Sequence, residues 1–314
     1  MFYNVENLFD PEDDSTKNDN DFTPNSKKHW TYNRLHTKLE HITQVIIAAG
    51  QWELPAIVGM CEVENRLVLE MLQRKSTISK YRYQIVHYDS PDARGIDVAA
   101  IYRPDLFKVV ASKPIRLTIK DRPHKKTRDI LYIKGVALAS KDTLHIFVNH
   151  WPSKLGGAAA SDPYRLFAAQ TLKKAIDSII VKNHNSKVIV MGDFNDEPDS
   201  KSIQELTLNK SLQSNNPSIL INLATPLMKA GKGTNNYRGR WSAIDQIMVS
   251  QTLINSRSGL TTSSEKFRAV SDDFLLVSNR NNEKVPFRTY SGPQYLGGYS
   301  DHLPIIVELN IVKP

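Results

Sequence analysis

Cysteine is nearly absent from this sequence, which has one such residue in 314. An internal disulfide framework is therefore excluded. Cys61 lies in the apolar stretch AIVGMCEVEN, so we expect a small buried hydrophobe rather than a nucleophile. With a single cysteine, the sequence also lacks the cysteine cluster of cysteine-based zinc motifs.

Long hydrophobic runs are also missing. No apolar stretch approaches the roughly 18 residues that a membrane-spanning helix needs, so the sequence predicts a soluble protein. The opening MFYNVENLFD has neither the basic region nor the apolar region of a signal peptide. The chain nonetheless begins almost inside a strand-like segment, which is compatible with an export signal removed upstream. The compartment, exported or cytoplasmic, therefore stays open.

No internal repeat of 20–50 residues and no linker divides the chain. Its length and its 40% hydrophobic content are sufficient for one large core, so we predict a single domain over residues 1–314. The acidic stretch DPEDDSTKNDND (10–21) lacks the glycine and the final glutamate of an EF-hand loop. We therefore expect it to be a solvated loop.

The net charge of +8 is unevenly distributed. Residues 103–134 contain ten Lys or Arg and three Asp, most densely in KDRPHKKTRD (120–129). A positive field suits phosphate-bearing partners. A solvated hairpin tip explains the same composition equally well.

Hydrophobic periodicity predicts many strands and few helices. Helices are expected at 31–50, 66–75 and 161–184, with Thr31 and Ser161 as N-caps, Gly50 as a stop and Pro163 in the first turn of the third. The strand-like segments are 55–65, 81–88, 95–103, 106–119, 129–140, 142–150, 187–194, 241–250 and 303–312, whereas 207–240 is expected to form loops. This content favours an α/β fold with two mixed β-sheets packed face to face and helices on the outer faces.

The stretch VIVMGDFNDEP (188–198) carries a buried strand directly into polar residues. Side chains two apart on an extended chain point to the same face, so Asp193 and Asn195 should face one site while Phe194 packs away from it. Gly192 would permit close approach of a ligand or another backbone. In isolation, the motif is equally typical of an ordinary capped turn.

The same pattern recurs along the chain. Polar side chains able to bind a metal interrupt or end strand-like runs at Asn4, Glu62, Asp97, His150, Asp245, Asp301 and His302. Each residue alone is weak evidence, but the repetition is difficult to explain by caps and turns.

With these motifs, the sequence resembles the endonuclease/exonuclease/phosphatase family, which includes pancreatic deoxyribonuclease. The resemblance runs from Asn4 to His302, and its most specific stretches are GDFN and SDHLPI, followed by NVENLFD and the glutamate of CEVEN. It implies a four-layered α/β/β/α sandwich with mostly antiparallel mixed sheets. It also implies hydrolysis of phosphate esters with Mg²⁺ or Mn²⁺, and Ca²⁺ is a further possible cation.

The resemblance assigns the metal site to Glu62 with Asn4 and Asp301. Such a sparse oxygen ligand set agrees with the preference of Mg²⁺ for a few carboxylates plus water and substrate phosphate.

The resemblance also implies the catalytic set. Asp193 would orient or deprotonate the attacking water, and Asn195 would hold the phosphate or the water. His302 would stabilise the transition state or act as the base of a dyad, and His150 would take the complementary acid or oxyanion role. Asp245 is the family's carboxylate partner for one of the two histidines.

Two further assignments are our own. Asp97 is a candidate carboxylate to orient the other histidine, and Arg94 is a candidate for substrate phosphate, although a surface salt bridge explains Arg94 equally well. The segment NHWPSKLGG departs from the branch of the family that repairs abasic DNA, which has tyrosine near the position of His150. Trp151 is either part of a substrate-facing loop or a cover for the core.

Three functional classes follow. A nuclease acting on DNA or RNA is the first candidate because of the basic segment, which makes nucleic acid the first candidate partner. A phosphatase or phosphodiesterase for a small or lipid phosphate ester is the second, with segments 207–240 and 251–298 available to build a pocket. A non-catalytic binding protein of the same fold is the third. No obligate protein partner is evident.

Overall fold

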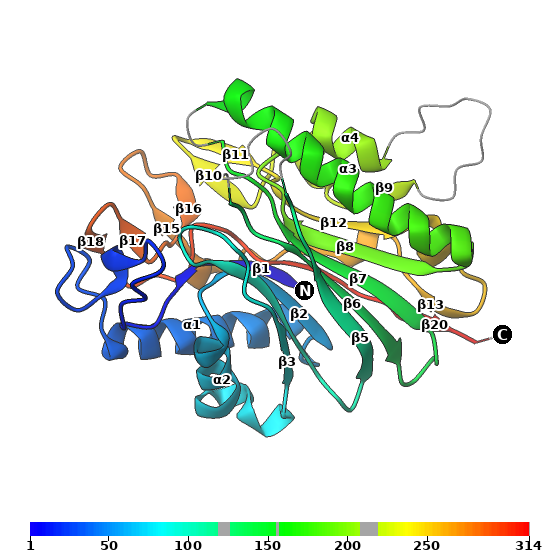
Figure 1. The fold of residues 1–314 in the computed structure, drawn as a ribbon, viewed down its shortest axis with the longest axis horizontal. Coiled ribbons are helices and arrows are strands. Elements are labelled where there is room, and N and C mark those ends of the chain that lie inside the picture. The colour runs from blue at the N-terminus through cyan, green and yellow to red at the C-terminus, as the bar shows by residue number, and fades with distance from the viewer. Residues whose placement is uncertain (119–125, 155–156, 208–218, 314) are drawn as a thin grey trace.

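Two six-stranded sheets packed face to face form the centre of the molecule (Figure 1). The computed structural model describes residues 1–118, 126–154, 157–207 and 219–313. Helices α1 (Tyr32–Gly50) and α2 (Arg66–Lys75) cover the outer face of the first sheet, and α3 (Ala158–Lys182) and α4 (Lys201–Thr207) cover that of the second. The four-layered α/β/β/α sandwich predicted from the sequence is confirmed.

The first sheet joins the two ends of the chain. Its order is β14 (Phe267–Ala269), β19 (Ile305–Val307), β1 (Phe2–Leu8), β2 (Ile57–Val63), β4 (Asp97–Tyr102) and β3 (Gln84–His87). Strands β1 and β2 are parallel, and the other neighbours in this sheet are antiparallel. The first and last of the predicted motifs are thereby brought to one sheet.

The second sheet has the order β5 (Phe107–Ile115), β6 (Ile130–Ala137), β7 (Thr143–His150), β8 (Lys187–Asp193), β12 (Asp245–Ser250) and β9 (Leu220–Asn222). Only β7 and β8 are parallel within it, and α3 is the crossover between them. Their carboxyl ends therefore lie at the same edge of the sheet.

Short elements lie between the main strands along the chain. The small antiparallel pairs are β10 (Asn235–Tyr237) with β11 (Arg240–Ser242), β13 (Gly259–Thr261) with β20 (Asn310–Val312), β15 (Leu276–Ser278) with β16 (Lys284–Pro286), and β17 (Tyr290–Ser291) with β18 (Gln294–Tyr295). Short helices are α5 (Thr225–Lys229) and α6 (Gln251–Ile254), and 3-10 turns lie at Asn20–Phe22, Thr77–Tyr81, Ser264–Lys266 and Asp273–Leu275.

Three buried apolar layers hold the sandwich together, as alternation along the strands requires. In β7, Ile146 and Val148 point into the layer between the sheets, whereas Phe147 packs under α3. A third layer fills the space between α1, α2 and the first sheet. Cys61 is fully buried in the layer between the sheets, as predicted.

Several expected boundaries require correction. Thr31 caps α1 as predicted, since its side chain accepts a hydrogen bond from the Arg34 amide. The predicted cap at Ser161 is wrong because α3 begins one turn earlier, at Ala158, which also places Pro163 beyond the first turn. Segment 207–240 contains short elements in its described part, and 303–312 divides between two sheets because β19 and β20 have different partners.

The basic stretch 120–129 lies mostly outside the described residues. Its described end is not a surface hairpin tip, because Thr127, Arg128 and Asp129 are all buried. Within the described part of the chain, no helix has the length and hydrophobicity that a membrane crossing requires.

Candidate active site

Polar side chains from several strands meet where β7 and β8 end. His150 is the last residue of β7, Asp193 is the last residue of β8, and Asp245 is the first residue of β12. In the strand register, Asp193 lies opposite both His150 and Asp245. These three residues therefore stand side by side across one edge of the second sheet, and all three are buried.

Asp193 is hydrogen bonded to a residue of the opposite sheet. Its Oδ2 accepts a hydrogen bond of 3.1 Å from Nδ2 of Asn4, which belongs to β1 of the first sheet. Its Oδ1 accepts a hydrogen bond of 2.9 Å from the backbone amide of Asn195. The Nε2 atoms of His150 and His302 lie 3.7 and 3.9 Å from Oδ2. Burial raises the pKa of Asp193 to about 7, although the nearby His302 opposes this shift.

His302 and Asp245 form a buried pair. Nδ1 of His302 lies 2.7 Å from Oδ2 of Asp245, an oxygen that also accepts a hydrogen bond from the Thr234 hydroxyl. Burial by itself would lower the pKa of His302, but Asp245 and Asp193 raise it well above its usual value. The carboxylate therefore fixes the ring orientation and leaves Nε2 directed toward Asp193.

His150 has the opposite electrostatic character. Burial, together with the cations of Arg128 and Arg94, holds its pKa well below the usual value, so the ring is neutral. Among the described residues, no partner lies at hydrogen-bond distance from its buried Nδ1. Two histidines on either side of Asp193 are thus held in different protonation states by their surroundings.

Local backbone irregularities place Glu62 at the same edge. The β1–β2 pairing shifts register between Asn4 and Leu8, and Glu6, Asn7 and Glu62 have φ angles of 48°, 58° and 61°. Bulges of this kind redirect side chains next to functional sites. Here, Oε2 of Glu62 accepts a hydrogen bond of 3.0 Å from the Asn7 amide.

An arginine lies beside each of the carboxylates of Glu62 and Asp301. Arg94 is about half exposed, donates to Oδ1 of Asn7 at 2.7 Å and lies 3.9 Å from Oε2 of Glu62. Arg288 pairs with Oδ2 of Asp301 at 2.7 Å, whereas Oδ1 of Asp301 lies 4.0 Å from Nε2 of His302. The predicted residues Arg94, Glu62 and Asp301 are therefore parts of the same polar edge.

The Gly-Asp-Phe-Asn segment is arranged differently from a simple extended chain. Asn195 lies beyond the end of β8 with a φ angle of 52°, so alternation along a strand does not determine its position. Its side-chain amide donates to the Trp151 carbonyl at 3.0 Å. Phe194 packs edge-on against Trp151, with ring centres 4.8 Å apart, and both are fully buried. Trp151 therefore covers the core and does not face a substrate.

Gly192 serves a close approach of backbone. A Cβ atom at this position would lie 2.4 Å from the Asn149 carbonyl oxygen on β7. The glycine thus permits the parallel strands that present His150 and Asp193 to lie together.

The prediction that Asp97 orients the second histidine is wrong. Asp97 binds His87 instead, with Oδ2 of Asp97 3.0 Å from Nε2 of His87. Because β4 pairs with β3, its first residue faces a side chain of the neighbouring strand, whereas β7 belongs to the other sheet.

Arg128 is a residue that sequence reasoning did not single out. It is buried, donates to the Trp151 carbonyl at 2.8 Å and pairs with Oδ2 of Asp92 at 3.2 Å. The same carbonyl receives the Asn195 side chain, so Arg128 supports the segment that follows His150. Its burial could not be predicted from the sequence, because Arg128 precedes the predicted strand and is one of several basic residues in 120–129.

Within the described residues, three groups of side chains bring potential metal ligand atoms within 4.8 Å of one another. They are Asp193 with Asp245 and His302, Asp193 with Cys61 and His150, and His87 with Asp89 and Asp97. Glu62 and Asp301 belong to none of these compact groups. A cation that retains several water molecules does not require protein ligands in mutual contact.

Comparisons with known proteins identify the family and the fold of the chain. The family model described as the endonuclease/exonuclease/phosphatase family matches residues 1–311. No curated protein sequence matches the chain significantly.

Solved structures share the fold at low sequence identity. A mannosyl-6-phosphatase from Bacteroides thetaiotaomicron is 17% identical, with a TM-score of 0.60 and coverage of 99% of this chain and 98% of that one. The catalytic domain of human Nocturnin, solved with sulfate, is 19% identical, with a TM-score of 0.57 and coverage of 88% and 87%. D. rerio TDP2 in complex with a single-stranded DNA product is 14% identical, with a TM-score of 0.56 and coverage of 88% and 93%.

The family model spans nearly the whole chain, and the solved structures share its sandwich fold. The protein therefore belongs to the endonuclease/exonuclease/phosphatase family, whose members are hydrolases of phosphoester bonds.

Proposed function

We propose that this protein is a divalent-metal-dependent phosphoesterase that cleaves phosphodiester bonds at the edge formed by β7, β8 and β12. The observation that carries the proposal is the position of Asp193, which lies within 4 Å of His150 and His302 and is hydrogen bonded to Asn4 of the opposite sheet. Such a concentration of buried titratable groups at one sheet edge is typical of a catalytic centre rather than a structural core.

The donor set fits a hard cation such as Mg²⁺ or Mn²⁺. Glu62, Asn4 and Asp301 offer carboxylate and amide oxygens. Oε2 of Glu62 accepts a hydrogen bond from the Asn7 backbone amide, and Oδ2 of Asp301 pairs with Arg288. We assign the cation to these three residues. When bound, it supplies positive charge beside the anionic phosphate oxygens.

The protein groups supply orientation and proton transfer. Asn4 and the Asn195 amide hold the Asp193 carboxylate in place from two sides, so we assign Asp193 to orient or deprotonate the attacking water. Asp245 orients His302, whose Nε2 directs a proton toward the same point. The pair thereby stabilises negative charge that develops on the phosphoryl group.

The neutral imidazole of His150 and the guanidinium of Arg94 complete the assignment of roles at the site. A neutral imidazole whose Nε2 lies 3.7 Å from Asp193 suits a hydrogen bond to a phosphoryl oxygen or to the leaving group. Arg94 is half exposed over Glu62 and provides a planar fork for phosphate. Asn195 would hold the phosphate or water beside it.

Nucleic acid is the first substrate candidate. The excess of basic residues supports electrostatic attraction to a polyanion. A related fold has been solved with a single-stranded DNA product, which is consistent with the same substrate class.

A small phosphate ester is the second candidate, and the cations around the site favour it. Within the described residues, Arg240 pairs with Glu197 at 2.8 Å, Lys154 with Asp196 at 3.2 Å, and Arg288 with Asp301 at 2.7 Å. A cation that is already paired with a carboxylate contributes little to binding the phosphate backbone of a nucleic acid. One of the proteins with a related fold is a mannosyl-6-phosphatase.

The discriminating experiment measures hydrolysis of single-stranded DNA, RNA, a phospholipid and a sugar phosphate, each with Mg²⁺ and with chelator. We expect turnover of one class that chelator abolishes. For a nuclease, affinity measured at increasing salt should fall steeply, roughly tenfold or more for several phosphate contacts between low and moderate salt. A flat salt response indicates the small substrate. Absence of hydrolysis of every class with Mg²⁺ and with Mn²⁺ would refute the proposal.

A further inference from the structure

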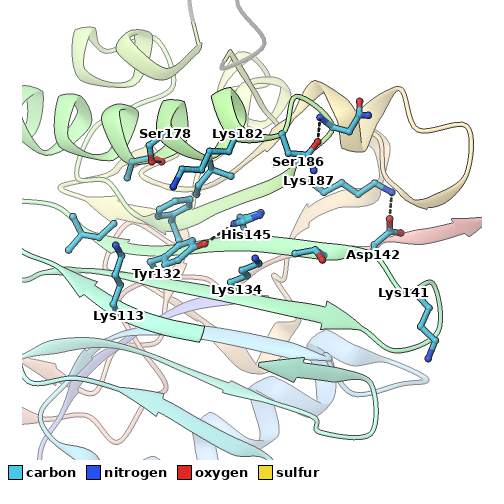
Figure 2. A pocket seen from close by; sticks show the side chains of 17 residues that line it. Lys113, Tyr132, Lys134, Lys141, Asp142, His145, Ser178, Lys182, Ser186 and Lys187 are labelled. Atoms are coloured by element: carbon cyan, nitrogen blue, oxygen red, sulfur yellow. Dashed lines mark hydrogen bonds and ion pairs between the residues drawn. The ribbon is translucent and has the colours of Figure 1, made fainter. Parts of the chain in front are cut away.

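A groove of about 680 Å³ opens at the end of the second sheet opposite the active site (Figure 2). Its floor includes Thr143 and His145 from the start of β7, and one wall is the last part of α3. His145 and His150 are five residues apart on β7, which corresponds to about 17 Å along an extended strand. The groove is therefore separate from the proposed active site around Asp193.

Lysine dominates the lining. Lys113, Lys134, Lys141, Lys182 and Lys187 line the groove together with one acidic residue, Asp142. Asp142 is already engaged, since its carboxylate lies 2.8 Å from Nζ of Lys187 and accepts a hydrogen bond from the Leu260 amide. In the described part of the chain, Lys113, Lys134 and Lys182 have no carboxylate at ion-pair distance.

The groups that face Lys134 add no negative charge. Lys134 lies opposite His145 in the β6–β7 register, and His145 is hydrogen bonded to the Tyr132 hydroxyl at 2.8 Å. Burial and the Lys134 cation lower the pKa of His145 to about 4, so the ring is neutral near pH 7. Figure 2 shows Lys113 from β5 and Lys182 from α3 on different sides of Tyr132, and Nζ of Lys113 lies 6.0 Å from the centre of its ring.

Ordinary structural roles explain two of these lysines but not the third. Lys182 lies in the last turn of α3, where a cation offsets the helix dipole. Lys113 lies on the edge strand β5, where lysine discourages edge-to-edge association. Lys134 lies on the interior strand β6, half-buried, where a cation without an acid partner decreases stability.

The face of the sheet also changes character at this end. Beneath the body of α3, the outward side chains are apolar, among them Ile130 and Phe147. Further along the same strands, Lys134 and His145 take outward positions. A hollow lined by lysines, beside a helix–sheet interface that is otherwise apolar, is a candidate site for a ligand.

We propose that this lysine groove, formed by Lys113, Tyr132, Lys134, His145 and Lys182, binds a small molecule that carries at least two phosphate groups. Its volume lies in the range of roughly 300–1,000 Å³ common for small-molecule sites. Three cations from a helix and two strands match several negative charges at once, and the Tyr132 hydroxyl lies among them. The site does not depend on the proposed function, because binding here requires no hydrolysis.

Calorimetric titration with inorganic pyrophosphate in chelator tests the proposal. Wild type should bind one equivalent, and the double variant K134A/K182A should bind at least about tenfold more weakly, as expected when charge-assisted hydrogen bonds are lost. The matched control K108A/K174A removes the same charge from β5 and from the exposed side of α3, and should bind within about twofold of wild type. Both double variants should retain wild-type phosphoesterase activity and the wild-type circular dichroism spectrum.

Three results would overturn the proposal. The first is the absence of saturable binding by wild type. The second is equal weakening in both double variants, which indicates general attraction by net charge. The third is binding that is lost in Arg94→Ala but kept in K134A/K182A, which places pyrophosphate in the active site. A single-stranded oligonucleotide that binds far more tightly than pyrophosphate, with the same lysine dependence, would replace the small ligand by a nucleic acid.

Discussion

At the scale of single residues, the polar edge is organised by what each neighbour does to Asp193. Asn4 and the Asn195 amide hydrogen bond to its carboxylate, whereas burial favours its protonated form and raises its pKa to about 7. His302 is kept charged by Asp245, and His150 is kept neutral by burial and nearby arginines. Chemically similar side chains thus receive different roles from their surroundings.

Asp245→Asn is the sharpest test at this scale. The change keeps the size of the side chain but removes the carboxylate that fixes the His302 ring at 2.7 Å. We expect kcat to fall by roughly 10²–10⁴, comparable to the loss of other acid–base orienting groups, with an unchanged fold. Steady-state kinetics and circular dichroism measure both effects.

Thr234→Val is the matched control for this prediction. It removes the hydrogen bond that the Thr234 hydroxyl donates to the same oxygen of Asp245 and the one that it accepts from the Asp245 backbone amide, but leaves the carboxylate and its pairing with His302. The expected loss of kcat is about tenfold or less, in line with the modest net contribution of neutral hydrogen bonds. A kcat for Asp245→Asn within threefold of wild type would remove Asp245 from the catalytic assignment.

At the scale of elements, the site depends on how β7 and β8 end together. The two strands are parallel and joined by α3, so His150 and Asp193 emerge at one edge. The contact between them is tight at Gly192, where a Cβ would meet the Asn149 carbonyl at 2.4 Å. Backbone proximity, rather than side-chain packing, sets the distance between the two catalytic candidates.

Gly192→Ala should therefore separate the two strand ends. We expect a loss of about 1–3 kcal/mol in the free energy of unfolding from overpacking. We also expect a fall of about tenfold or more in kcat, because small displacements of reacting groups are costly. Urea unfolding and kinetics provide the two readouts.

The variant Val190→Ala distinguishes an effect of lower stability on kcat from an effect of separating the two strand ends. Val190 is buried on β8 beneath α3, so its truncation leaves a cavity without pushing β7 away. It should cost about 2 kcal/mol in the free energy of unfolding but leave kcat nearly unchanged. Equal losses of kcat in both variants would mean that strand separation is not what the glycine controls.

Much of the element pattern could be predicted from the sequence, and the exceptions have physical causes. Apolar runs interrupted by single polar residues mark β7, β8 and β12, because buried strands tolerate such residues only at their ends or in partnered positions. The backbone irregularity at Glu62 could not be predicted, since it depends on register shifts of β2 against β1 and β4. The partner of Asp97 depends on which strand lies beside β4, and the sequence does not contain that information directly.

At the scale of the whole molecule, the sandwich places two sites with different chemistry at opposite ends of one sheet. The proposed catalytic edge gathers carboxylates and histidines, and the lysine groove gathers three lysines that have no carboxylate at ion-pair distance among the described residues. The resemblance carried by GDFN and SDHLPI predicted the first site. The groove was not predicted, because its lysines are spread over β5, β6 and α3 and each is unremarkable in its own segment.

The central claim is that oxygen ligands from distant segments hold one divalent cation at the catalytic edge. Binding of Mn²⁺, followed by electron paramagnetic resonance, tests it without reference to any substrate. Wild type should bind Mn²⁺ at this site, Glu62→Gln should lose about tenfold or more in affinity, and Asp89→Asn, in the separate group with His87 and Asp97, should match wild type. Wild-type affinity in Glu62→Gln, with binding lost in Asp89→Asn, would contradict the account.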